Sequence, residues 1–291
     1  MSIGPFNDLA EDSAGNIFFK VVTTGATADF GGGALAAGQI LVSLDTNGSY
    51  RWGNSFGSTN VNWNSIAARG SLYCAAGTLK AATDFGGGLI TPSGWDLLLV
   101  CFDQTGNYQW ANNYATPSGI GSYGTTIDSS GNVTIAGGKA GNASMDFGGG
   151  VVTGPASDPI FVASYTSAGA YRWAHMYSAS PSTYEQARRV TSNANDDIIF
   201  SGEMYGSVDF GGGPTNYVAS STVFVVMLDT NGNHLYSVGS GGVSQDYSEG
   251  IAAAGTTHAY VGGDLYSTLD FGPGPVTSTG NRGMFLGRLG L

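Results

Sequence analysis

Five aspartates recur at nearly equal spacing, and each opens a glycine-rich pentapeptide. Asp-Phe-Gly-Gly-Gly begins at Asp29, Asp84, Asp146 and Asp209, and Asp-Phe-Gly-Pro-Gly begins at Asp270, with steps of 55, 62, 63 and 61 residues between them. One interpretation is a ring of carboxylates that holds a cation or a polar ligand. We favour a structural role, because aspartate can accept hydrogen bonds from the following amides, glycine permits positive φ, and phenylalanine can pack between repeats.

Acidic residues that do not recur in every repeat are the candidates for catalysis. Glu185 and Glu249 lie in the fourth and fifth repeats, and Glu203 and Arg188 also belong to the fourth. Glycosidases use paired carboxylates about 5 to 9.5 Å apart, so a five-bladed-propeller glycoside hydrolase is the alternative hypothesis. The repeats carry no long insertions that would build a cleft, and the common serine-hydrolase, zinc-protease and phosphate-loop motifs are missing. We therefore predict a protein without enzymatic activity or cofactor.

The sequence also argues against a metal site. Asp229-Thr-Asn-Gly-Asn233 is the segment most similar to the start of a calcium loop. An EF-hand requires a bidentate glutamate at the twelfth position, which here is Ser240. We interpret these segments as hairpin turns and predict no metal.

An aromatic residue precedes the first strand expected in every repeat. Next to polar residues such as Asn64, Glu185 and Glu249, aromatic rings could stack on sugars and form a weak glycan site at one end of the fold. The alternative is that each ring packs in the groove between repeats, which is the more frequent role of such residues. The five aromatic residues are Phe6, Trp63, Tyr123, Tyr184 and Tyr247.

Four short strand signals separated by tight turns recur in each repeat, which predicts antiparallel four-stranded sheets. Repetition of such sheets around an axis is typical of a β-propeller. We predict an all-β fold with one domain over residues 1–291, a five-bladed propeller. The blades cover residues 1–57, 58–116, 117–179, 180–241 and 242–291.

The fifth blade is predicted to lack its outer strand, because the sequence stops as the third strand finishes. An uncovered sheet edge is usually managed by charge, proline or a partner. Arg282 and Arg288 flank this strand, and Met284 and Leu286 lie between them. We predict that these four residues form an edge for a partner.

Two turn motifs resemble those of the bacterial SBBP-type and NHL-like propeller repeats. Asp12-Ser-Ala-Gly-Asn16 and Asp128-Ser-Ser-Gly-Asn132 match the first motif, and Asp45-Thr-Asn-Gly48 and Asp103-Gln-Thr-Gly106 match the second. The resemblance covers essentially the whole chain. It implies a propeller that serves as a platform for binding and assembly, with no shared catalytic residues. The second repeat lacks the first motif, and the third repeat varies the second as Thr166-Ser-Ala-Gly169.

Composition restricts the class of partner. Ten basic residues against 21 acidic ones give a formal charge of -11, which disfavours binding to nucleic acid or to an anionic membrane surface. The sequence shows no apolar stretch long enough to span a membrane and no secretory signal at its start. Cys74 and Cys101 lie on strands expected to be neighbours; a bridge is open to them, but we favour buried free thiols.

Together these observations predict a non-catalytic recognition or assembly module that binds a carbohydrate or a protein partner. A structural or attachment component of a virion or a cell surface would fit, as would self-association into a homo-oligomer. The identity of the partner and the oligomeric state do not follow from the sequence.

Overall fold

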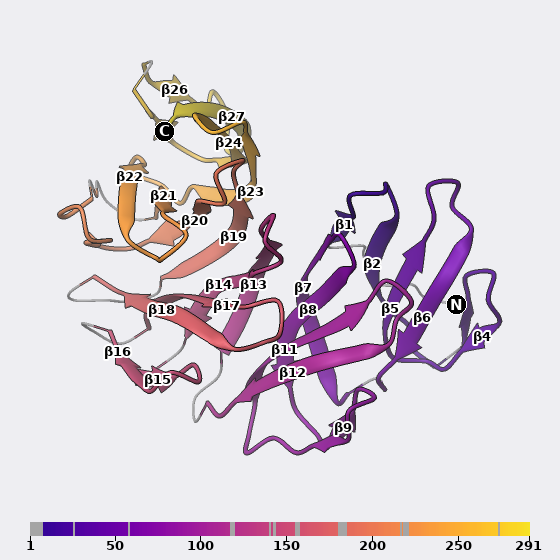
Figure 1. Ribbon diagram of the computed structural model, residues 1–291. Helices are drawn as coiled ribbons and strands as arrows, with labels where there is room; N and C mark the ends of the chain where they lie inside the picture. Colours follow the sequence, from indigo (N-terminus) through magenta and orange to yellow (C-terminus); the bar gives the residue numbers. More distant parts are fainter. Residues whose placement is uncertain are drawn as a thin grey trace. The chain divides into compact units, whose positions relative to one another are not determined.

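The structure, a computed structural model, contains only strands and turns among the residues that it describes (Figure 1). Those residues are 8–25, 27–57, 59–116, 120–139, 141, 144–154, 158–179, 185–215, 217, 221–272 and 274–291. No helix in these ranges is long and apolar enough to cross a membrane. The all-β class predicted from the sequence is confirmed.

Five antiparallel sheets make up most of the described chain, and four of them have four strands. The first sheet has the order β1 (Leu9–Glu11), β2 (Ile17–Val22), β5 (Gln39–Leu44) and β6 (Tyr50–Ser55). The second has the order β7 (Val61–Arg69), β8 (Leu72–Leu79), β11 (Asp96–Asp103) and β12 (Tyr108–Tyr114). The third has the order β13 (Ile120–Ile127), β14 (Val133–Lys139), β17 (Ile160–Tyr165) and β18 (Tyr171–Tyr177).

The last two sheets differ in strand number. The fourth sheet has the order β19 (Gln186–Ser192), β20 (Ile198–Met204), β21 (Thr222–Leu228) and β22 (His234–Ser240). The fifth has only β23 (Tyr247–Ala254), β24 (His258–Leu265) and β27 (Gly283–Gly290). The described residues therefore confirm the four-stranded antiparallel unit of a propeller blade and the missing outer strand of the last sheet.

Small hairpins project between the second and third strands of four of the sheets. They are β3 (Ala28–Asp29) with β4 (Ala34–Leu35), β9 (Thr83–Asp84) with β10 (Leu89–Ile90), β15 (Ser144–Asp146) with β16 (Val151–Thr153), and β25 (Thr268–Leu269) with β26 (Val276–Thr277). In the fourth repeat a single bridge between Asp209 and Pro214 takes this place.

The chain forms two compact units. One comprises Met1–Val133 with Tyr165–Ala170, and the other comprises Thr134–Ser164 with Tyr171–Leu291. The organisation of both units as one domain, and the closure of five blades into a ring, stay predictions.

Aromatic rings dominate the interior of each unit. In the first unit Phe18 and Tyr73 meet edge to face with their ring centroids 5.4 Å apart. In the second unit Phe200 and Phe210 meet edge to face at 6.0 Å, and Phe224 joins the same cluster. These side chains come from the two central strands of each sheet or from the Asp-Phe-Gly loop, and their burial is the main apolar contribution to stability.

The Asp-Phe-Gly loops have the structural role expected of them. In every copy one aspartate oxygen accepts hydrogen bonds from the amides two and four residues later, as with Gly31 at 2.8 Å and Gly33 at 3.1 Å from Asp29 Oδ1. Gly31 and Gly33 have φ of 104° and 102°, a region that glycine adopts readily.

The middle glycine of the loop is needed for a different reason, because the first side chain of the fourth strand lies against it. A Cβ atom built on Gly32 would lie 2.0 Å from the Tyr50 ring. The same overlap, at 2.2 Å in each case, occurs between Gly87 and Tyr108, between Gly149 and Tyr171, and between Gly212 and His234.

Tryptophans on the fourth strand connect each repeat to the next. Trp52 Nε1 donates to the carbonyl of Gln104 at 3.1 Å, and its indole lies over Gly106, where a Cβ would come within 2.7 Å. In the same way Trp110 donates to Ser167 at 2.8 Å, and Trp173 donates to Thr230 at 3.0 Å. Each of these tryptophans therefore packs against a turn of the following repeat.

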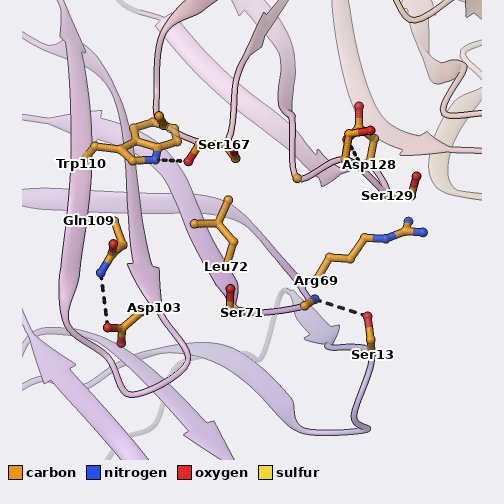
Figure 2. Close-up of a pocket in the computed structure, with 14 residues that line it drawn as sticks. Ser13, Arg69, Ser71, Leu72, Asp103, Gln109, Trp110, Asp128, Ser129 and Ser167 are labelled. Atoms are coloured by element: carbon orange, nitrogen blue, oxygen red, sulfur yellow. Dashed lines mark hydrogen bonds between the residues drawn. The ribbon is translucent and has the colours of Figure 1, made fainter.

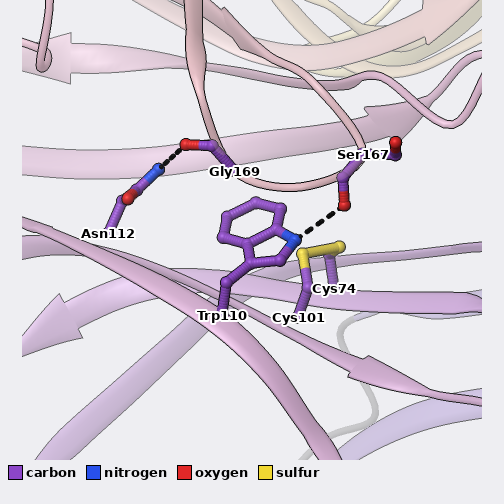
Figure 3. The surroundings of a disulfide bond; sticks show 6 residues. All are labelled: Cys74, Cys101, Trp110, Asn112, Ser167 and Gly169. Carbon is purple, nitrogen blue, oxygen red and sulfur yellow. Dashed lines mark hydrogen bonds between the residues drawn. A yellow bond between two sulfur atoms is a disulfide. The ribbon is translucent and has the colours of Figure 1, made fainter. Parts of the chain in front are cut away.

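The cysteines correct one expectation. Cys74 and Cys101 form a disulfide rather than two free thiols (Figure 3). They are directly opposite each other on β8 and β11, with Cα atoms 4.1 Å apart. Such a separation is typical of a non-hydrogen-bonded antiparallel pair, where side chains approach most closely. The sequence placed them on neighbouring strands but did not establish this register.

We expect Gly87→Ala to destabilise the first unit by about 1 to 3 kcal/mol, because the new methyl group overlaps the Tyr108 ring. Chemical denaturation monitored by circular dichroism would measure this. Gly280→Ala is the matched control, since a Cβ there meets nothing within 4 Å. In a Tyr108→Ser background Gly87→Ala should cost clearly less, and an undiminished cost would contradict the proposed overlap.

We expect reduction of the Cys74–Cys101 bond to lower the stability of the protein by about 3 to 4 kcal/mol. The bridge closes a loop with a sequence separation of 27 residues, and opening it increases the entropy of the unfolded chain. Thermal unfolding with and without a reductant measures the effect. The variant Cys74→Ala with Cys101→Ala should no longer respond to the reductant; a wild-type protein that is equally insensitive would show that the bridge contributes nothing.

Candidate functional site

Three of the sheets begin with a strand that contains one extra residue. The extra residues are Asn64 in β7, Arg188 in β19 and Glu249 in β23. A bulge of this kind interrupts the alternation of side chains and redirects the extra one. Asn64 and Glu249 are two of the predicted site residues, and the sequence contained no sign that they would be bulged.

In the second unit the bulged Arg188 is the centre of a charged cluster. Its Nε lies 2.7 Å from Oε2 of Glu203, and its Nη1 lies 3.5 Å from Oε1 of Glu249. The guanidinium also lies 5.3 Å from the centroid of the Tyr247 ring, a favourable cation–π distance. Arg189 Nη2 adds a longer contact of 4.0 Å to Glu249 Oε2.

Glu203 is enclosed in this cluster, with 1% of its surface exposed. Its Oε1 accepts a hydrogen bond of 2.9 Å from the amide of Ser248 on the fifth sheet, and its Oε2 accepts one of 3.4 Å from Gln186 Nε2. Burial raises the pKa of Glu203 to about 7, although the charge and hydrogen bond of Arg188 act in the opposite direction.

Glu185 is buried in a similar way, with 2% of its surface exposed. Both of its carboxyl oxygens lie within hydrogen-bond distance of the Ala179 amide, at 2.9 and 3.0 Å. Burial raises its pKa to about 7; the Ala179 hydrogen bond lowers it, and the charge of Asp158 raises it further. A substrate could reach neither oxygen without displacing the surrounding residues.

The cluster therefore has the character of an ion-pair network between the fourth and fifth sheets. Of Glu185, Glu203 and Glu249, only Glu249 has an exposed side chain. A glycosidase needs two carboxyl groups that face the same substrate. Here Arg188 bonds to both Glu203 and Glu249. In the described ranges no group of three His, Cys, Asp or Glu side chains is arranged to hold a metal ion.

The predicted aromatic ring is only partly described. Trp63 has 3% of its surface exposed and packs edge to face against Phe56, with ring centroids 5.6 Å apart. It cannot stack on a sugar in this position, so for Trp63 the packing alternative holds. Tyr123 and Tyr247 are half-buried. The other two residues of the set, Phe6 and Tyr184, lie outside the described residues.

The first unit contains a pocket of about 770 Å³ that the sequence did not point to (Figure 2). Turns from the first three repeats surround it, and Arg69, Asp103, Trp110 and Asp128 are among its lining residues. The carboxylates bind their own turns: Asp128 Oδ1 accepts from the Ser130 amide at 2.9 Å, for example. Such turns recur in the first four sheets, and this repetition was the signal available in the sequence.

The pKa of Asp103 reflects the same turn geometry. Burial raises this pKa, but hydrogen bonds from Thr105 and Asn107 outweigh the effect, so the value lies below the usual one for aspartate. Both acids of this pocket, Asp103 and Asp128, stabilise turns, and we assign them no catalytic role.

The edge of the fifth sheet is the most unusual feature of the second unit. Strand β27 pairs with β24 over eight residues without a register shift, and no described strand pairs with its other edge (Figure 1). Met284 and Leu286 have 86% and 77% of their surface exposed. Strand β27 therefore has an open edge and exposed apolar side chains, and the binding of a partner there stays a prediction.

A comparison with the fourth sheet shows how different this strand is. Gly202 in the fourth sheet and Gly263 in the fifth both lie opposite the bulge of the first strand. Gly202 pairs with Phe224 of β21 and Gly263 pairs with Phe285 of β27, so these two phenylalanines occupy equivalent positions. The positions of β21 that correspond to Met284, Leu286 and Arg288 are all buried; they are Val223, Val225 and Met227.

The backbone of β27 is also open to a partner. The Leu291 amide donates to the Thr257 carbonyl at 2.8 Å, which continues the β24–β27 ladder. Hydrogen-bonded and non-hydrogen-bonded pairs alternate in an antiparallel ladder. Because Leu291 is hydrogen-bonded, every second residue before it directs its N–H and C=O groups toward β24. The residues in between, which include Met284, Leu286 and Arg288, direct these groups away from β24, toward the open edge.

The two arginines of the predicted edge have different roles. Arg282 Nη2 lies 2.5 Å from Oδ2 of Asp264, so its charge is paired within the sheet. Arg288 Nη2 donates to Nε2 of His258 at 2.8 Å and is exposed. No carboxylate pairs with Arg288 among the described side chains.

Comparisons with known proteins do not identify a family. No protein-family model matches the chain, and no curated protein matches it in sequence. Among solved structures, a protein of unknown function from Bacteroides caccae matches with a TM-score of 0.42 and 11% identity, over 91% of this chain and 72% of that one. YCF48 bound to D1 peptide matches with a TM-score of 0.36 and 9% identity, over 94% and 82%. We transfer no function from either.

We expect the thermal stability of the protein to fall as the pH rises from about 4.5 to about 7. The folded protein favours the protonated form of Glu185, so the stability from this group is complete below its ordinary pKa of 4.5 and is lost as the pH rises through about 7. The loss is on the order of 3 kcal/mol, and the buried Glu203 adds a change in the same direction.

Unfolding midpoints measured over this pH range, for wild type and for Glu185→Gln, test the expectation. The variant should show a clearly shallower dependence on pH. Glu249→Gln removes a charge from an exposed side chain and is the matched control. Identical slopes for wild type and Glu185→Gln would contradict the assignment.

Proposed function

We propose that this chain is a non-catalytic, propeller-type recognition and assembly module that binds a protein partner by strand addition. The observation that carries the proposal is the open β27 edge. Its outward backbone groups at Met284, Leu286 and Arg288 can hydrogen-bond to an added strand, whose own side chains would lie beside Met284 and Leu286 on the same face of the sheet.

Several features favour a protein over a carbohydrate as the partner. Trp63, one of the aromatic residues of the hypothetical glycan site, is buried. An exposed strand that alternates large apolar side chains and lacks a protective bulge or lysine is a template for pairing, and proteins normally avoid leaving one uncovered. A particle such as a virion, or a cell surface, would present suitable partners in many copies.

The non-catalytic character rests on the surroundings of the acids. Glu185 and Glu203 are buried and bonded within the fold, and Arg188 bonds to both Glu203 and Glu249. Such a network is typical of contacts that hold two sheets together, rather than of two acids that face one substrate.

We expect Leu286→Lys to abolish incorporation of the protein into its native complex. The substituted side chain is exposed in the free protein, so the unfolding midpoint should change little, whereas a lysine on an edge strand opposes pairing with an added strand. Mass measurement of intact complexes from the natural source would compare wild type, Leu286→Lys and the control Val243→Lys, an exposed apolar residue between β22 and β23.

Hydrogen exchange distinguishes strand addition from other contacts. In the complex the amides of Met284, Leu286 and Arg288 should be protected, and in the free protein they should exchange rapidly. A complex of unchanged mass with Leu286→Lys, or slow exchange of these amides in the free protein, would contradict the proposal.

A further inference from the structure

The pocket of the first unit lies where the second repeat has a shorter turn than its neighbours (Figure 2). In the first, third and fourth sheets the turn between the first two strands consists of residues 12–16, 128–132 and 193–197. In the second sheet only Gly70 and Ser71 form this turn. Both residues line the pocket, so the short turn leaves room between the longer turns of the first and third repeats.

The fourth strand of the second sheet also differs from its neighbours. An arginine precedes the tryptophan of this strand in the first and third sheets, as Arg51 and Arg172, but Gln109 has this place in the second. Arg51 Nη2 donates to the carbonyl of Gln104 at 2.9 Å, and Arg172 Nη2 donates to that of Thr230 at 2.7 Å. Each of these carbonyls also accepts from the neighbouring tryptophan.

The corresponding carbonyl at the pocket belongs to Ser167. Among the described residues it accepts only from Trp110 Nε1, at 2.8 Å. Gln109 Nε2 donates instead to Asp103 Oδ2 at 3.3 Å, and Figure 2 shows this side chain turned away from Ser167. The pocket therefore contains a carbonyl of the kind that binds an arginine in two other repeats, with no arginine of the chain on it.

The charge of the pocket favours a cation on this side. Two carboxylates, Asp103 and Asp128, line the pocket together with one guanidinium, that of Arg69. Arg69 Nη1 donates to the carbonyl of Ile127 at 3.5 Å and lies across the pocket from Gln109 (Figure 2). The formal charge of -11 on the chain adds a field of the same sign as the carboxylates.

The first repeat shows the effect of a guanidinium beside such a turn. Asp45 opens the turn that corresponds to the turn of Asp103. Hydrogen bonds from the amides of Ser49 and Asn47 lower the pKa of Asp45, and the charge of Arg51 lowers it further. A guanidinium next to Asp103 would have the same favourable interaction with the carboxylate.

We propose that this pocket binds a guanidinium group, which is either the side chain of an arginine in a partner protein or a free guanidino compound. The group takes the place that Arg51 and Arg172 have in the other repeats, and it donates to the Ser167 carbonyl and the Asp103 carboxylate. This inference does not depend on the β27 edge, because all residues of the pocket belong to the first unit.

Titrations with capped amino acids test the proposal, with the indole N–H resonance of Trp110 as the reporter. This N–H shares the Ser167 carbonyl, so N-acetyl-arginine amide should shift its resonance. N-acetyl-citrulline amide, which has the same shape without the charge, should bind about tenfold more weakly. Free L-arginine distinguishes the two sources of the group. A lower affinity than that of the capped form assigns the site to an arginine within a chain, and an equal or higher affinity assigns it to a free compound.

Variants of the full chain locate the binding. Gln109→Arg supplies the group from the protein itself, as in the first and third sheets, and should weaken binding of N-acetyl-arginine amide about tenfold without lowering the unfolding midpoint. Asn47→Arg adds the same charge to an exposed turn of the first repeat and is the matched control. Asp103→Asn should also weaken binding but keep the turn, because Asn193 Oδ1 accepts the same two amide hydrogen bonds in another turn.

Several results would overturn the inference. One is a Trp110 resonance that N-acetyl-arginine amide leaves unchanged, and another is equal affinity for the arginine and citrulline compounds. Unchanged affinity in Gln109→Arg would place the binding elsewhere. Preferential binding of N-acetyl-glutamate amide that Arg69→Gln abolishes would make the pocket a site for anions.

Discussion

The contact between a tryptophan of one repeat and a turn of the next is the interaction on which the arrangement of the repeats depends. Each indole donates its N–H to a carbonyl of that turn, as Trp110 does to Ser167, and lies flat over the turn's glycine. The contact joins a directional hydrogen bond to a large buried aromatic area, so it sets both the spacing and the rotation between neighbouring repeats. It requires a turn between the third and fourth strands of the following repeat.

No fourth strand pairs with the fifth sheet among the described residues, and the last contact of this kind is that of Trp173 with Thr230. The fourth sheet accordingly has Tyr236 in place of tryptophan, and the fifth has Pro273 in place of the middle glycine. These two departures from the repeat pattern are consistent with one physical cause, the missing fourth strand.

Buried charges in both units bind the bulges of neighbouring strands. Lys20 Nζ donates to the carbonyls of Trp63 and Asn64 at 2.8 and 2.7 Å, and Glu203 accepts from the Ser248 amide beside the second bulge. A bulge leaves backbone groups without ladder partners, and burying them unpaired would be costly. Residues that look like catalytic acids in the sequence therefore satisfy backbone groups where two sheets meet.

How much the sequence determined can be judged from particular residues. The repeated Asp-Phe-Gly loops, the tight turns and the apolar strands established the all-β class and the four-stranded unit, because these depend on local turn chemistry and periodicity. The sequence could not show the Cys74–Cys101 bridge, which depends on register between strands. The sequence also could not show the burial of Trp63 or the ion pair between Arg188 and Glu203. Bulges and contacts between sheets arise only when strands that are distant in the sequence pack together.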